Sequence, residues 1–225
     1  MKIVALSDTH GKHRQYPDSW IPDGDVLMHC GDFTKHGRVN ELEDFLDWFS
    51  QFSHEYKIFI AGNHDAIMTN HGNDGPPINA RKEERIEELL NKYWFEEKII
   101  YLHNSGKTID GLTFYGSPYS NSPPGWYFNT RKEENQDVWE KVFDDTEILI
   151  THGPPYRIND KTRLSGHIGS EKLREKVEEL PNLKVHLYGH NHGAHGESDK
   201  LENSYNCSVI DDNYEISNEP VVIQL

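Results

Sequence analysis

The stretch KIFIAGNHD, residues 57–65, joins a short apolar run to a cluster of small and polar residues. Its first half, Lys57–Ile60, predicts a buried strand. Gly62 permits a sharp backbone turn at the strand end. Asn63 then offers an amide oxygen, His64 a titratable nitrogen, and Asp65 a carboxylate that can orient the imidazole. Polar loops after strands are common, so this turn alone does not distinguish a functional site from an ordinary loop. Its interpretation depends on the other strand ends.

Length and charge limit the classes of protein to which the chain can belong. The composition of the 225 residues shifts nowhere sharply enough to mark a linker, so we expect one domain over residues 1–225. The net charge of −15 argues against binding to long nucleic acid or to an anionic membrane surface. No segment approaches the roughly 20 apolar residues of a membrane span. Only two cysteines occur, Cys30 and Cys207, which favours a reducing compartment. We therefore expect a cytoplasmic protein, and its oligomeric state stays open.

Apolar runs that end in polar clusters recur along the chain. Short buried strands are predicted at residues 3–6, 26–30, 57–60, 147–150 and 184–188. Helices are predicted at residues 40–52, 81–93, 138–143 and 171–180. This alternation predicts βαβ units and an at least partly parallel sheet. Around the Asp110-Gly111 turn signal, the runs 99–102, 106–109 and 112–115 suggest antiparallel strands that start a second sheet. We expect segments 205–210 and 221–225 to close that sheet.

Five of the predicted strand ends carry oxygen and imidazole donors. These are Asp8 and His10, Asp32, Asn63 and His64, His152, and finally His190 and His192. Ligands gather beyond the carboxyl ends of parallel strands, so we expect these side chains to meet at one edge. Asp, His and Asn donors without thiolates suit manganese, iron, zinc or similar divalent ions. One tetrahedral metal needs only four ligands. Two metals bridged by a carboxylate would use them all, and such a pair serves phosphoryl displacement.

At this point the sequence resembles a known family. The motifs DTH (8–10), GDFT (31–34), GNHD (62–65), THGPP (151–155) and GHNHG (189–193) are similar, in order and context, to those of the calcineurin-like metallophosphoesterases. The segments SPYS (117–120), GWYFN (125–129) and GHNHGAHG (189–196) resemble the small MPPED-like, class III nucleotide phosphodiesterase branch. The resemblance implies an α/β fold, namely a four-layer α/β/β/α sandwich of two mixed sheets flanked by helices.

The resemblance also implies a role for each motif residue. The first metal would be held by Asp8, His10 and His192, and the second by Asn63, His152 and His190, with Asp32 bridging both. His64 would stabilise the transition state or protonate the leaving group, and Asp65 would orient its imidazole. The implied enzyme is a phosphodiesterase on small nucleotide-like esters, with manganese favoured and a metal-bridging hydroxide as nucleophile. The alternatives are a phosphoprotein or diphosphate hydrolase, or a non-catalytic scaffold. A scaffold would be expected to lose motif residues, and none is lost.

Several features stay open at the level of sequence. The aromatic loop at residues 117–129 is either packed by its own side chains or a substrate wall. The loop at residues 70–77 is either a solvated loop or a lid. Arg157 or Arg163 could meet a substrate phosphate or lie in solvent. Of the remaining histidines, His29 and His186 are expected in strands, and His36, His54, His71 and His103 at the surface. His13, His167 and His195 are candidates for contact with the metal ligands or with the substrate.

Overall fold

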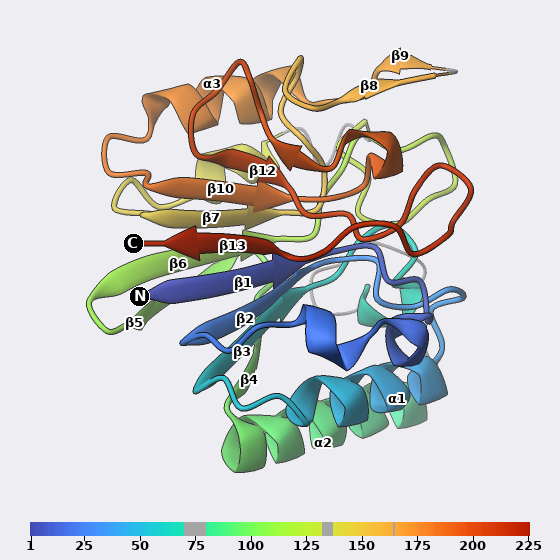
Figure 1. Cartoon of the computed structure of the whole chain (residues 1–225). Coiled ribbons are helices and arrows are strands. Elements are labelled where there is room, and N and C mark those ends of the chain that lie inside the picture. The colour runs from blue at the N-terminus through green and yellow to red at the C-terminus, as the bar shows by residue number, and fades with distance from the viewer. Residues whose placement is uncertain (70–79, 132–136, 164) are drawn as a thin grey trace.

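Two mixed β-sheets pack face to face in the computed structural model, with helices on their outer faces (Figure 1). The structure describes residues 1–69, 80–131, 137–163 and 165–225. The loop predicted at residues 70–77, which includes His71, lies outside the described residues. The predicted fold class, an α/β sandwich of two mixed sheets flanked by helices, is confirmed. Among the described helices, none has the length and apolar character that crossing a membrane requires.

The first sheet has the strand order β13-β1-β2-β3-β4. Its parallel strands are β1 (Lys2–Leu6), β2 (Val26–Cys30), β3 (Tyr56–Ile60) and β4 (Ile99–Tyr101), and β13 (Val221–Gln224) pairs antiparallel with β1. Two expectations are wrong here. We expected β4 to be antiparallel, but it extends the first sheet parallel to β3. We expected β13 in the second sheet, but it forms an edge of the first, where the alternation of buried Val221 and Ile223 with exposed Val222 fits a half-buried strand.

The second sheet has the order β11-β12-β10-β7-β6-β5. The strands β5 (Ser105–Ile109) and β6 (Leu112–Ser117) form the predicted antiparallel hairpin. Parallel pairing joins β6, β7 (Ile148–Thr151), β10 (Val185–Tyr188) and β12 (Ser204–Asn206), and β11 (Gly196–Glu197) runs antiparallel to β12. A separate two-stranded hairpin, β8 (Lys161–Thr162) and β9 (Gly166–His167), was not predicted.

Helices cover the outer faces of the two sheets. Figure 1 shows α1 (Val39–Ser50) and α2 (Ala80–Glu97) on the first sheet and α3 (Glu171–Glu179) on the second. Short 3-10 turns are η1 (His13–Gln15), η2 (Asp18–Trp20), η3 (Ala66–Met68), η5 (Val138–Lys141) and η6 (His192–Ala194). The helix predicted at residues 138–143 is only η5, because the backbone becomes extended at Val142.

The apolar core has two parts because strand side chains alternate between the faces of a sheet. From β1, Ile3 and Ala5 point between the sheets, where they join Ile58 and Ile150. Val4 and other residues of opposite parity pack instead against the outer helices. Burial of such aliphatic side chains contributes about 1.5–3 kcal/mol each. The strands are thereby fixed from both faces, and so are the positions of their ends.

Candidate metal centre

Five strands deliver polar side chains to one edge of the sandwich. Asp8 and His10 follow β1, Asp32 follows β2, Asn63 and His64 follow β3, His152 follows β7, and His190 and His192 follow β10. Three of these strands are parallel neighbours in the first sheet and two are parallel neighbours in the second. The topology therefore brings together the residues that the sequence identified as candidates.

The backbone at these strand ends adopts an uncommon conformation. The φ angles of Asp8, His10, Asp32 and His190 are 60°, 44°, 56° and 68°. Asp and His enter this left-handed region more readily than most residues, yet each instance costs on the order of 1–3 kcal/mol. Four such residues at one edge indicate that packing holds a strained backbone in place. The strain turns each side chain out of its strand direction and toward a common point.

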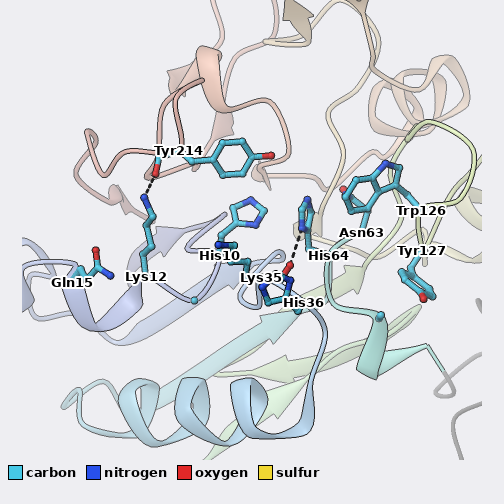
Figure 2. Close-up of a pocket in the computed structure, with 12 residues that line it drawn as sticks. His10, Lys12, Gln15, Lys35, His36, Asn63, His64, Trp126, Tyr127 and Tyr214 are labelled. Atoms are coloured by element: carbon cyan, nitrogen blue, oxygen red, sulfur yellow. Dashed lines mark hydrogen bonds between the residues drawn. The ribbon is translucent and has the colours of Figure 1, made fainter.

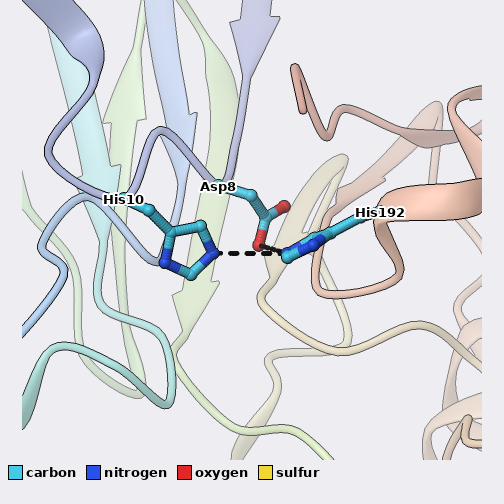
Figure 3. A group of neighbouring side chains, drawn as sticks. All are labelled: Asp8, His10 and His192. Carbon is cyan, nitrogen blue, oxygen red and sulfur yellow. Dashed lines mark hydrogen bonds and ion pairs between the residues drawn. The ribbon is translucent and has the colours of Figure 1, made fainter. Parts of the chain in front are cut away.

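The first group of converging side chains consists of Asp8, His10 and His192 (Figure 3). One ligand atom from each lies within 4.8 Å of the other two. The His10 and His192 Nε2 atoms are 3.2 Å apart, and His192 Nε2 lies 3.6 Å from an Asp8 oxygen. The Asp8 carboxylate also accepts backbone hydrogen bonds from His190 at 3.0 and 3.2 Å. This contact ties the end of β1 to the end of β10 across the two sheets.

A second group consists of Asp32, His152 and His190, with Asn63 beside them. Asp32 Oδ2 lies 3.3 Å from His152 Nε2 and 3.7 Å from His10 Nε2, so the carboxylate lies between the two groups. His152 Nδ1 donates a hydrogen bond to the Cys30 carbonyl at 3.0 Å, which directs Nε2 toward Asp32 and the Asn63 oxygen, 3.0 Å away. Because His152 Nε2 faces two oxygen acceptors, it must either carry a proton or bind a cation that lies between them.

Burial and charge set the protonation of these groups. Burial lowers the pKa of His10 to about 4 and that of His190 to about 3, so both rings are neutral near pH 7. Burial also opposes the charged form of His152, but the Asp32 carboxylate outweighs it and raises the pKa to about 9. The pKa of Asp32 is held well below its usual value, against its own burial, mainly by His152. Two buried carboxylates among imidazoles form a donor set that fits divalent cations.

Glycines let these donors approach one another. A Cβ at Gly62 would lie 2.4 Å from Asp32 Oδ1 and 2.6 Å from His152 Cε1. A Cβ at Gly189 would lie 2.3 Å from Asp8 Oδ2. Both glycines directly precede a predicted ligand, Asn63 or His190. A side chain at either position would collide with the neighbouring donors, which explains why the motifs have glycine there.

The structure differs from the predicted role of Asp65. Its fully buried carboxylate accepts hydrogen bonds from the Gly62 and Thr34 amides, both at 2.8 Å, and from the Thr34 hydroxyl at 2.7 Å. Within the described part of the chain, no hydrogen bond joins Asp65 to the His64 ring. The His64 Nδ1 atom instead lies 3.4 Å from the Lys35 carbonyl. Asp65 therefore holds the turn together, and the hydrogen-bond partner of the imidazole among the described residues is the Lys35 backbone oxygen.

His64 lies between the metal-binding groups and an open cavity (Figure 2). Its ring centroid is 4.4 Å from that of His10, and one of its nitrogens lies within 4.8 Å of ligand atoms of His10 and Asp32. Geometry alone would thus also allow His64 to bind a metal. The cavity has a volume of about 860 Å³, within the usual range for small-molecule sites.

Aromatic and basic residues line this cavity. Trp126 and Tyr127 come from the loop for which a substrate wall was one interpretation, and Lys12, Lys35 and Tyr214 also line the cavity. Sequence reasoning missed the last three. The two lysines follow the strand-end motifs closely, which was an available signal. Tyr214 had none beyond a turn-like composition around it.

Of the other described residues with open interpretations, His36 lines this cavity and the rest lie outside it. Arg163 is largely exposed and lies 3.4 Å from Asp212, and Arg157 lies over the ring of Tyr156. His29 and His186 are buried in strands as expected, and His36 is exposed. His54 was expected to be exposed but is buried, and His103 is half-buried. Of the candidates for contact with the ligands, His13 binds Asp44, His167 binds Asp160, and His195 donates to the Ser208 carbonyl.

Comparison with known proteins agrees with this geometry. The chain belongs to the calcineurin-like phosphoesterase family, whose model matches residues 1–194. It is 33% identical to the UPF0046 protein K07C11.7 of Caenorhabditis elegans, over the whole chain and 75% of that protein. It is 32% identical to human metallophosphoesterase domain-containing protein 1, over the whole chain and 71% of that protein. One solved structure shares the fold with a TM-score of 0.65, over 94% of this chain and 91% of its own, at 12% identity.

Proposed function

We propose that the protein is a dinuclear metal-dependent phosphodiesterase that acts on small nucleotide-like esters. The observation that carries this proposal is the convergence of the two side-chain groups on the Asp32 carboxylate, which lies between His10 and His152. Asp8, His10 and His192 would hold one ion, and Asn63, His152 and His190 the other, with Asp32 shared. Manganese is the favoured metal, although the same donors accept iron or zinc.

Bound divalent ions would supply an activated water and neutralise charge on the phosphoryl oxygens. The chain's own residues then divide the remaining work. His64 lies at the boundary of the metal-binding groups and the cavity, so its imidazole can donate a proton to a leaving oxygen or stabilise developing negative charge. The Lys35 carbonyl lies 3.4 Å from Nδ1 and can accept its proton, so Nε2 is the nitrogen that faces the substrate, and it acts as the acid when it carries a proton of its own.

Several features support a small substrate. The cavity is of small-molecule size and is lined by aromatic rings, and the chain as a whole is strongly acidic. Long nucleic acid is therefore a poor candidate. We also propose that residues 1–225 act as one domain, with the terminal strands β1 and β13 paired, and that the protein works in the cytoplasm, where its two buried cysteines stay reduced.

The test uses metal-reconstituted protein on the chromogenic diester bis(p-nitrophenyl) phosphate, with p-nitrophenyl phosphate, a phosphopeptide and pyrophosphate for comparison. We expect the diester to be preferred. His64→Ala should slow turnover by about 10²–10⁴-fold, the usual contribution of a positioned acid, with metal content nearly intact. Asp32→Asn should lose bound metal.

Faster turnover of the phosphopeptide or of pyrophosphate would favour the alternative hydrolases. If no ester is turned over with manganese or any other divalent ion, the non-catalytic scaffold is the hypothesis that remains. Loss of both metals from His64→Ala would contradict the role given to His64.

A further inference from the structure

Two partly exposed aromatic rings line the cavity next to His64. Trp126 is 38% exposed and Tyr214 is 44% exposed, although large apolar side chains are mostly buried in the described core. The Trp126 ring centroid lies 4.4 Å from that of His64. The Tyr214 centroid lies 5.2 Å from that of His10 and 4.9 Å from that of His192. Figure 2 shows Trp126 on one side of His64 and Tyr214 above His10 on the other.

Tyr214 is fixed in this position by its loop. Its φ angle is 61°, a conformation that is costly for an aromatic residue. The Asp211 side chain accepts the amides of Asn213 and Glu215 at 2.8 and 2.9 Å, and the Tyr214 amide bonds to the Asp211 carbonyl at 2.9 Å. The Lys12 ammonium bonds to the Tyr214 carbonyl. A strained, well-bonded turn therefore holds a half-exposed ring over the metal-binding groups.

The Trp126 side is anchored in the same manner. Asn129, three residues further on, donates side-chain hydrogen bonds to the Ser122 and Pro123 carbonyls at 2.8 and 3.0 Å. The loop is closed by these bonds and by the buried Phe128, yet Trp126 does not join that packing. The loop therefore has two parts with different surroundings. Its base is packed by its own side chains, while Trp126 faces the cavity.

We propose that Trp126 and Tyr214 form an aromatic clamp that selects phosphoesters carrying a planar ring, such as a nucleobase, next to the metal centre. This inference rests on the proposed function and specifies its substrate class. Aromatic faces stack on any planar ring, and such stacking contributes without base-specific hydrogen bonds. The clamp therefore recognises a ring and not one particular base. Tyr214 lies beyond residues 1–194, so the family-wide match does not include this half of the clamp.

The experiment compares two ligands that differ only in the ring, adenosine 5′-monophosphate and ribose 5-phosphate. Their dissociation constants are measured by calorimetry on manganese-loaded protein, so the result does not depend on turnover. The variants are Trp126→Ala, Tyr214→Ala and Tyr214→Phe. The matched control is Trp94→Ala, because Trp94 on α2 is equally exposed, at 37%, but lies outside the cavity.

We expect wild-type protein to bind the adenosine compound more tightly, by roughly 5- to 150-fold, the range that one stacked base supplies. The ratio should fall toward one in Trp126→Ala and in Tyr214→Ala. It should persist in Tyr214→Phe, which keeps the ring, and in Trp94→Ala. Affinity for ribose 5-phosphate should stay constant throughout, which also shows that each variant is folded and loaded.

A wild-type ratio near one would overturn the clamp, as would equal loss of both ligands in the alanine variants. If the protein hydrolyses the diester but binds the two ligands equally well, the proposed function is supported and the clamp is refuted. Selective binding of the adenosine compound by a protein that hydrolyses no ester would instead support the clamp and refute the proposed function.

Discussion

Replacement of Gly62 by alanine should disrupt the metal centre without touching a ligand. The new Cβ would lie 2.4 Å from Asp32 Oδ1, about 0.6 Å inside the ~3.0 Å that such carbons keep from other heavy atoms. It would also lie 2.6 Å from the backbone nitrogen of Asp32 and from His152 Cε1. Asp32 and His152 cannot easily move aside, because the strands and their hydrogen bonds hold both residues in place.

The size of the effect follows from the displacement. Metal–ligand distances tolerate only about 0.2 Å, so a shift of about 0.6 Å at Asp32 would spoil at least one bond to each ion. Changes in residues that position ligands typically reduce metal affinity by about 10- to 100-fold. Overpacking of this kind should also reduce the free energy of unfolding by about 1–3 kcal/mol.

The assay is a chelator-competition titration of manganese on the purified variant, with urea unfolding of the metal-free protein alongside. Gly193→Ala is the matched control. It also adjoins a predicted ligand, but the three atoms nearest to its Cβ all belong to the carboxylate end of Asp212, the first at 2.9 Å. We expect Gly193→Ala to bind metal like wild type. Wild-type metal affinity in Gly62→Ala would refute the packing argument.

Two further predictions concern buried polar groups. Asp65→Asn places an amide N–H against backbone donors, so it should destabilise the fold by about 1–3 kcal/mol in urea unfolding. Unchanged stability with reduced turnover would instead restore Asp65 as the residue that orients His64. Burial lowers the pKa of His186 to about 3, so the folded ring is neutral above that pH. In the unfolded chain the ring has a pKa of ~6.5 and takes up a proton below pH ~6.5. Its contribution is complete above pH ~6.5 and falls by about 1.4 kcal/mol per unit below it, so His186→Gln should flatten the acid limb of stability against pH. Acid limbs of equal slope in wild type and in His186→Gln would contradict this prediction.

Local patterns predicted the strands that matter for the centre. β1, β2, β3, β7 and β10 are largely buried on both faces, so each is a mostly apolar run in the sequence. Because parallel strands present the same end to one edge, the run boundaries also indicated which residues would meet. The motif residues at those boundaries could therefore be identified before any coordinates.

Pairing between distant segments could not be predicted in this way. β13 is a short alternating segment that fits an edge of either sheet, and its partner β1 lies at the opposite end of the sequence. The position of Tyr214 depends on a turn closed by Asp211 and on a bond from Lys12. Two of the donors to the Asp65 carboxylate likewise come from Thr34, on another strand end. Such contacts depend on tertiary structure, and the local sequence carries little trace of them.

The most direct test of the central claim is anomalous scattering from a crystal grown with manganese. We predict two peaks per chain that share Asp32, one bound by Asp8, His10 and His192, and the other by Asn63, His152 and His190. A single peak, a peak held by His64, or no peak at this edge of the sandwich would contradict the assignment.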